Sequence, residues 1–307
     1  MDNKVKKPSV ERVVFISFLV DISDLLVNVF IAILSGSVVM FSQALQGGSD
    51  LVSSTLLLIG VHRSKRKTDK NYPFGNGREL YFWNMMAAMV MLGVTATLSI
   101  VFGYRRFLHP ESINAFGLSL AVLTLALFTN SYSFYLSAIK LLKGHKINTY
   151  FRILKNSPFI EIKTVFVQDL MGAVASAIGI ISLLLYNFAD DARFDGIGAI
   201  SIGIVLVLLS VFLLDGIRQM IVGRSASEQT EKKIRHATLV LAEVEEVIDL
   251  KTMYLGANQL LVNLEVQVID KLTTTKIEKL INKIESNIKN EIPAVTHIQV
   301  ELKSPKR

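Results

Sequence analysis

Two aspartates, Asp50 and Asp169, each lie inside a long apolar run of this 307-residue chain. A carboxylate at the centre of a membrane-spanning helix costs about 2.5 kcal/mol or more unless it is paired, hydrated, protonated or bound to a metal. An acidic residue in such a place therefore marks a candidate functional site. Two of them on separate helices, in a chain that also has a polar C-terminal part, indicate a path for a cation.

A third polar residue, Gln46, lies four residues before Asp50, so the two side chains share one face of a helix. Two helices that present oxygen atoms at the same depth could hold a divalent ion between them. The alternative is that each aspartate is neutral and hydrogen-bonded to a serine or threonine of a neighbouring helix.

The first apolar run carries a second polar cluster, formed by Asp21, Asp24 and Asn28. This cluster could be a proton relay, with Asp24 as a candidate for proton coupling, or the polar wall of a cavity. The alternative is hydrogen bonding to Asn130 or Ser131 on the fourth apolar run. The sequence leaves both open.

Six segments are long enough to cross the hydrocarbon core of a membrane, which takes about 20 apolar residues. They are approximately 12–34, 37–62, 80–107, 114–141, 160–187 and 196–221. Lysine and arginine gather in the N-terminal segment and in the connections after the second and fourth runs, so both termini are expected in the cytoplasm. The start of the chain lacks the pattern of a cleavable signal peptide, so the first run is predicted to remain as a span.

The composition and motifs of the chain exclude several classes of protein function. Hydrophobic residues make up 51% of the chain, which is high for a soluble protein of this size. Cysteine is absent, so any metal must be held by oxygen or imidazole. The net charge of +7 fits basic cytoplasmic loops, and a nucleic acid partner is not expected. Nucleotide-binding loops and nucleophile triads are not visible, so neither an enzyme nor a bound cofactor is expected.

Residues 223–307 read as a soluble domain after a membrane domain of residues 1–222. A helix is predicted over 228–244 and strands over about 247–254, 260–268 and 295–302, with a helix around 277–288 between the last two. The order α-β-β-α-β predicts a small cytoplasmic α+β domain of the ferredoxin-like kind. The predicted fold class is thus a mainly α membrane protein with six transmembrane helices and this domain.

Several segments together resemble the cation diffusion facilitator family. They are SGSVVMFSQALQGGSDLVSS, YPFGNGRELYFW, Asp169 with the small residues after it, RFDGIGAISIGI and DLKTMYLGANQLLVNLEVQV. Their order and spacing, rather than any single one, carry the resemblance, which covers nearly the whole chain. The family has six spans and a C-terminal α-β-β-α-β domain, and its members typically export divalent metal ions in exchange for protons, as homodimers.

The resemblance implies a transport site at Gln46, Asp50, Val165 and Asp169. This chain departs from the family there, because Val165 cannot ligate and Gln46 is a neutral oxygen donor. Water, or Glu161 one turn before Val165, could complete the shell. Such an all-oxygen site favours Mn²⁺, Fe²⁺ or Mg²⁺ on chemical grounds, while Zn²⁺ also accepts carboxylates. Without imidazole, the exchanged protons are expected on Asp50 and Asp169.

Other metal sites of the family look weakened in this chain. A loop site would be formed by Asp69, Tyr72 and Asn76, where both imidazoles are missing, so no strong site is predicted. The metal ligands that some family members have in the cytoplasmic domain are also mostly missing from this chain. What remains there is a weak candidate set of Glu265, Glu301 and His297, which would otherwise be a solvated or dimer-facing surface.

The expected function is therefore efflux of Zn²⁺, Mn²⁺ or Fe²⁺ by a metal/proton antiporter, a homodimer in a prokaryotic plasma membrane. The alternative is a transport-deficient partner or metal-binding scaffold, for example the inactive half of a heterodimer. Loss of imidazole at every site favours this alternative, and retention of both intramembrane aspartates opposes it. A metal sensor acting through residues 225–307 is a third hypothesis.

Overall fold

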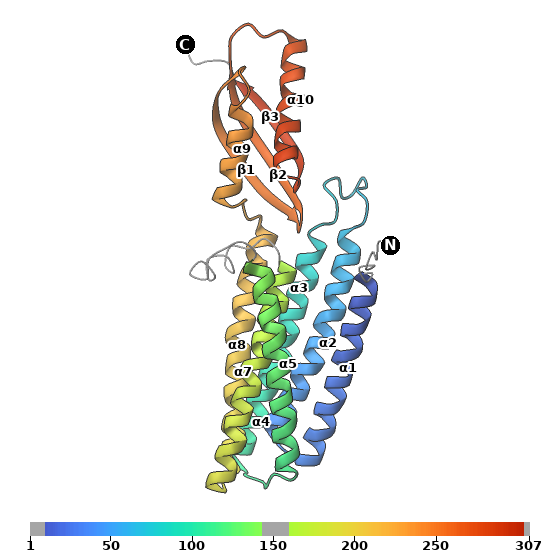
Figure 1. Cartoon of the computed structure of the whole chain (residues 1–307), viewed down its shortest axis with the longest axis vertical. Coiled ribbons are helices and arrows are strands. Elements are labelled where there is room, and N and C mark those ends of the chain that lie inside the picture. The colour runs from blue at the N-terminus through green and yellow to red at the C-terminus, as the bar shows by residue number, and fades with distance from the viewer. Residues whose placement is uncertain (1–9, 143–159, 304–307) are drawn as a thin grey trace, which may run out of the picture. The chain divides into compact units, whose positions relative to one another are not determined.

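The computed structural model describes residues 10–142 and 160–303, with side chains for residues 22–139 and 163–303. Contacts divide the chain into two compact units. The first contains the apolar helices as far as Gly216, and the second contains Gly60–Phe82 and the chain from Ile217 onward. A mostly helical membrane part and a small α+β part are thereby distinguished (Figure 1).

The apolar runs form long helices, as predicted. Their bounds are α1 Val10–Ser35, α2 Val38–Ser64, α3 Glu79–Val90, η1 Met91–Ala96, α4 Thr97–Leu108, α5 Phe116–Leu142, α7 Ile160–Ala189 and α8 Arg193–Val222. The π-helical turn η1 joins α3 to α4 without a break, so Glu79–Leu108 acts as one span. Within the described residues, five helices are long and apolar enough to cross a membrane, and α1 adds the shorter apolar stretch Ile22–Ser35. The chain is an integral membrane protein, and the predicted fold class is confirmed.

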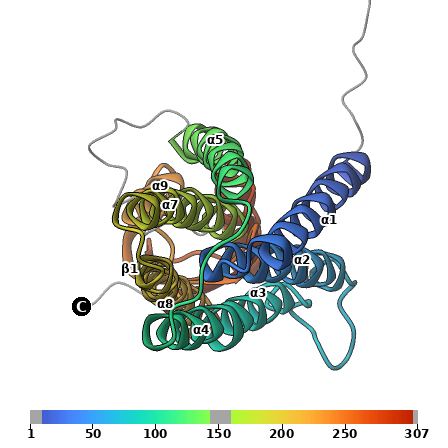
Figure 2. The ribbon, with the colours of Figure 1, turned by 90° about the horizontal axis from the view of Figure 1, so that it is seen from below.

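Close backbone contacts at glycines hold the helices of the first unit together. A Cβ at Gly103 of α4 would lie 2.8 Å from the carbonyl oxygen of Gly196 in α8, so only glycine allows this approach. A Cβ at Gly179 of α7 would likewise lie 2.8 Å from a methyl carbon of Val39 in α2. Seen end-on, α7 lies between α5 and α8, and α2 lies beside α1 (Figure 2).

The N-terminus of α2 is fixed by a buried carboxylate from α8. Asp195, which is 0% exposed, accepts hydrogen bonds from Ser37 Oγ at 2.6 Å, Val38 N at 2.7 Å and Val39 N at 3.1 Å. An anion at a helix N-terminus satisfies unpaired N–H groups and is favoured by the helix dipole. Arg106 of α4, also buried, pairs with the same carboxylate at 3.7 Å. Three helices are thereby held at one end of the bundle.

The second unit contains a three-stranded sheet with two helices. The elements are α9 Glu228–Leu239, β1 Val244–Gly256, β2 Gln259–Val268, α10 Thr274–Glu291 and β3 Val295–Lys303. The strand order is β1-β2-β3, with an antiparallel first pair and a parallel second pair joined through α10. Alternate residues of β2 are buried beside apolar residues of both helices, which gives the domain its own core. The predicted α-β-β-α-β order is confirmed.

The predicted helix over 228–244 was too long. The structure ends α9 at Leu239, where the amides of Val240 and Leu241 donate to carbonyls of the last turn. Val244, the last residue of the predicted helix, instead opens β1 and pairs with Val268. A buried valine fits either pattern, so apolar spacing alone could not place this boundary.

Candidate functional site

Asp50 of α2 contacts α7 through the side chain of Gln168. Gln168 Nε2 donates to Asp50 Oδ1 at 3.3 Å, and both residues are half-buried. Gln168 is the residue directly before Asp169, the second predicted aspartate. The two apolar helices that carry the aspartates are thus joined by polar side chains at this depth.

The contact between α2 and α7 has a definite antiparallel register. Asp50 meets Gln168, and Val39, eleven residues earlier in α2, meets Gly179, eleven residues later in α7. Counting four residues from the first contact in opposite directions places Gln46 level with Gly172. The predicted pair Gln46 and Asp50 therefore faces α7 over one helical turn.

Gln46 has an oxygen atom that suits a cation. The residue is only 3% exposed, and its Oε1 atom is buried with no hydrogen-bond partner. A buried carbonyl oxygen without a partner costs about 1–3 kcal/mol, and a cation bound there would satisfy it. Gln46 is therefore a candidate ligand on structural grounds as well as by sequence.

Asp169 is held from the other side of α7 by α5. Ser137 Oγ donates to Asp169 Oδ2 at 2.7 Å. One turn further along α7, a Cβ on Gly172 would lie 2.6 Å from the amide carbon of Asn130, so this α5 side chain packs directly on the glycine. Amide, hydroxyl and carboxylate groups of α2, α5 and α7 thus gather around residues 168–172.

The other predicted members of the site are placed differently. Val165 is 40% exposed and offers no ligand atom. Glu161, the proposed auxiliary ligand, belongs to α7, but its side chain lies outside the described residues. The same holds for Asp21 in the α1 cluster.

Asn28 and Asp24, the other members of the α1 cluster, are hydrogen-bonded to each other. Asn28 is 2% exposed, and its Nδ2 donates to the carbonyl oxygen of Asp24 at 3.0 Å and to Asp24 Oδ2 at 3.1 Å. This nitrogen is therefore engaged one turn back in α1 and not with the fourth span. A role for Asp24 in proton coupling stays a prediction.

A buried lysine was not singled out from the sequence. Lys163, near the start of α7, is 3% exposed, and its ammonium lies 4.5 Å from the centre of the Phe212 ring. Its side chain fills the space beside Gly216 of α8. A cation over an aromatic face is attracted by the ring, and the signal in the sequence was a single lysine at the edge of an apolar run.

The carboxylates of the weak candidate sites outside the membrane make local contacts with neighbouring groups. Asp69 Oδ1 accepts from the amides of Asn71 and Tyr72, both at 2.8 Å, which fixes a turn. On the open face of the sheet, Glu265 and Glu301 are register partners, and Lys303 lies 3.6 Å from Glu265. These carboxylates are therefore engaged in a turn or neighboured by a lysine.

His297 lies on the same sheet face and meets an aromatic ring. Its imidazole is 5.3 Å from the ring centre of Phe74 in an edge-to-face arrangement, and its Nδ1 lies 3.0 Å from Thr296 Oγ1. Within the part of the chain whose side chains are described, no group of three or more His, Asp or Glu residues is arranged to hold a metal.

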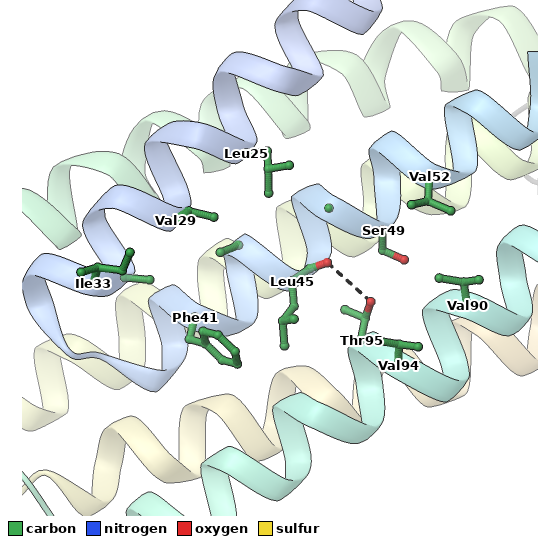
Figure 3. A pocket seen from close by; sticks show the side chains of 13 residues that line it. Leu25, Val29, Ile33, Phe41, Leu45, Ser49, Val52, Val90, Val94 and Thr95 are labelled. Carbon is green, nitrogen blue, oxygen red and sulfur yellow. Dashed lines mark hydrogen bonds between the residues drawn. The ribbon is translucent and has the colours of Figure 1, made fainter.

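An apolar pocket of the first unit lies elsewhere. It measures about 510 Å³ and lies between α1, α2 and the region around η1 (Figure 3). Its lining is almost wholly apolar, with Ser49 and Thr95 as polar members, and Thr95 Oγ1 donates to the carbonyl of Leu45 at 3.5 Å. Neither Asp50 nor Asp169 lines it, so this pocket is not the candidate cation site.

Comparison with known families decides the assignment. The model described as the cation efflux transmembrane domain matches residues 14–218, and the model described as the cation efflux protein cytoplasmic domain matches residues 226–303. The chain belongs to the cation diffusion facilitator family. The predicted resemblance is confirmed.

The relatives found in this family share little sequence identity with this chain. A mitochondrial proton-coupled zinc antiporter of Mus musculus is 21% identical over 244 residues, which is 79% of this chain and 43% of that protein. Metal tolerance protein C4 of Arabidopsis thaliana is 22% identical over 72% of this chain and 49% of its own length. Magnetosome protein MamM of Paramagnetospirillum magneticum is 23% identical over 76% of this chain and 69% of its own.

The chain therefore spans less than half the length of the mouse relative. A solved structure of a MamM CTD variant covers 26% of this chain and 95% of its own, with 16% identity and a TM-score of 0.25.

Proposed function

We propose that this chain exports a divalent metal cation from the cytoplasm in exchange for protons. The observation that carries the proposal is the link between α2 and α7, in which Gln168 bridges to Asp50 beside Asp169. Membership of the cation efflux family and the zinc antiporter name of a distant relative support it. Zn²⁺, Mn²⁺ and Fe²⁺ are the substrates considered.

The charges of the two aspartates support an exchange of metal for protons. Two ionised carboxylates, Asp50 and Asp169, match the charge of one dication, and two nearby carboxylates in a low dielectric repel each other when the metal is absent. At least one of them is then expected to hold a proton. Metal entry would release that proton, and helices α2, α5 and α7 would rearrange around the site in alternating access.

The test is transport by the purified chain in proteoliposomes that contain an internal pH dye. A panel of Zn²⁺, Mn²⁺, Fe²⁺, Co²⁺, Cd²⁺ and Mg²⁺ identifies the substrate by its coupled proton movement. Asp50→Asn and Asp169→Asn should each abolish coupled transport, whereas Asp191→Asn in the α7–α8 connection should not. Wild-type rates in the double variant Asp50→Asn/Asp169→Asn would refute the proposal.

Homodimer formation, a prokaryotic plasma membrane and cytoplasmic termini are parts of the same proposal. The basic connections after α2 and before α7 support the orientation. Chemical labelling of single cysteines is clean here, because the chain has none of its own. A cysteine at Lys67 should react only from the cytoplasmic side.

One observation favours a second function, that of a transport-deficient partner. Among the described side chains, no set of three acidic or imidazole groups converges on a metal. The two functions differ in a simple experiment. Vesicles that contain this chain alone take up metal if it is a transporter and do not if it needs an active partner.

A further inference from the structure

The geometry points to Gln168 as the second metal ligand of α7, in the role that Val165 cannot fill, with a site that selects hard divalent cations. This inference rests on the proposed function and names its substrate class. Gln168 and not Val165 faces α2, because its Nε2 lies 3.3 Å from Asp50 Oδ1, whereas Val165 is 40% exposed.

The hydrogen bond between Gln168 and Asp50 can become a pair of metal contacts by one small motion. Rotation of the terminal amide by half a turn exchanges Nε2 and Oε1 and leaves the rest of the side chain in place, since this torsion is broad and roughly two-fold. Oε1 would then lie where Nε2 lies, 3.3 Å from the carboxylate oxygen. Adjacent ligand oxygens around a six-coordinate ion with bonds of about 2.1 Å are separated by about 3 Å. The observed spacing therefore suits two neighbouring ligands of one ion.

A second, independent observation points to the same site. Gln46 Oε1 is buried, has no hydrogen-bond partner, and lies one turn from Asp50 on the face that meets α7. An unpaired acceptor is unfavourable in the metal-free state and becomes satisfied when a cation binds. With Asp169, the other carboxylate of the proposed transport site, the donors would be two carboxylates, Asp50 and Asp169, and two amide oxygens, Gln46 and Gln168.

This donor set determines which ions fit. Carboxylate and amide oxygens suit Mg²⁺ and Mn²⁺, whereas imidazole suits Zn²⁺. The amides also add ligands without adding negative charge, so the site remains balanced by one dication. A hard divalent cation is therefore the substrate class, and Mn²⁺ is the practical probe because its unpaired electrons report binding directly.

The experiment measures Mn²⁺ binding to the purified full-length chain in detergent by electron paramagnetic resonance, with Zn²⁺ as a competitor. Gln168→Leu removes both polar atoms at similar volume and should weaken Mn²⁺ binding by about tenfold or more, since even supporting groups of metal ligands contribute 10- to 100-fold. Gln168→Glu keeps an oxygen and should preserve or tighten binding. Gln168→His should shift the preference toward Zn²⁺ by about tenfold.

The matched control is Gln43→Leu, the same replacement at a buried glutamine of α2. It should leave Mn²⁺ affinity unchanged. Size-exclusion profiles and thermal unfolding of each variant establish that the fold is retained. If Gln168 only orients Asp50 in the empty site, Gln168→Leu removes a competing donor, and Mn²⁺ affinity is unchanged or higher. That result overturns the inference.

Binding and transport separate this inference from the proposed function. If wild type binds Mn²⁺ and Gln168→Leu does not, but neither moves metal in proteoliposomes, the ligand role stands and the transport proposal fails. If wild type and Gln168→Leu transport metal and bind Mn²⁺ equally, the transport proposal stands and the ligand role fails. A wild-type chain that binds neither Mn²⁺ nor Zn²⁺ overturns both.

Discussion

Asp195→Asn should strongly destabilise the helix bundle, although it only replaces one carboxylate oxygen with an NH₂ group. In the native structure, Oδ1 of Asp195 accepts from Ser37 Oγ and Val39 N, and Oδ2 accepts from Val38 N at 2.7 Å. The asparagine oxygen can keep the Oδ1 contacts, but its NH₂ group then faces the Val38 N–H, donor against donor. The buried Arg106 also loses one anionic partner at 3.7 Å, while it keeps the Glu111 carboxylate at 3.4 Å.

The magnitude follows from these contacts. A hydrogen bond to a charged group contributes about 1.5–3 kcal/mol, and removing one partner of a buried ion pair costs about 3–5 kcal/mol. Arg106 retains bonds to the carbonyl oxygens of Gly36 and Glu111, which moderates the loss. We therefore expect Asp195→Asn to lower the free energy of unfolding by about 3 kcal/mol.

Reversible unfolding from mild detergent into SDS measures this difference. The control is Asp191→Asn in the same connection, where the carboxylate accepts one exposed bond from Arg193 N at 2.9 Å. A surface change of this kind should alter stability by about 0.5 kcal/mol or less. Equal losses in the two variants, or a loss below about 1 kcal/mol for Asp195→Asn, would refute the argument that a buried anion caps the N-terminus of α2.

Three further predictions concern packing and charge. Gly172→Ala places a Cβ 2.6 Å from the Asn130 amide carbon, so overpacking should cost about 1–3 kcal/mol in the same SDS assay, and an unchanged stability would contradict the α5–α7 contact. Ile284→Ala, at a fully buried position of α10, should cost about 2–5 kcal/mol by thermal unfolding of the cytoplasmic domain, whereas a cost below about 1 kcal/mol would place Ile284 outside the core. Lys251→Met removes an ammonium 2.9 Å from Asp249, whose pKa is lowered mainly by that hydrogen bond, and should raise the Asp249 pKa toward 3.8 in an NMR titration. In wild type, this pair contributes stability above pH 3.8 that is lost as the pH falls through the lower folded-state pKa, so an identical titration in Lys251→Met would exclude the pair as the cause.

Most of the fold could be predicted from the sequence because its signals are local. Each span is a run of about 20 apolar residues, and these runs exceed what a soluble fold needs. In the cytoplasmic domain, alternation along β2 separates buried Val262 and Leu264 from exposed Asn263. The end of α9 was missed because Val244 fits the buried face of either a helix or a strand.

The candidate site was only partly predictable, because it depends on rotation about the helix axis. Gln168 and Asp169 are adjacent, yet neighbouring helical positions point about 100° apart, so Gln168 reaches α2 while Asp169 reaches Ser137 of α5. The adjacent polar pair within an apolar run was a visible signal. Which of the two residues faces which helix requires the packing of three helices, and no spacing within α7 determines it.

The same limit explains why charge pairing across the bundle was not predicted. In the sequence, Asp195 is only one of several acidic residues near the start of the last apolar run, but in the structure it is buried and caps α2 from 158 residues away in the chain. An acid in an apolar environment therefore has two distinct uses in this molecule. Asp195 is fully compensated by three donors and a guanidinium, which makes it structural. At the α2–α7 contact, by contrast, the buried Gln46 oxygen one turn from Asp50 has no hydrogen-bond partner, and the proposed cation would satisfy it.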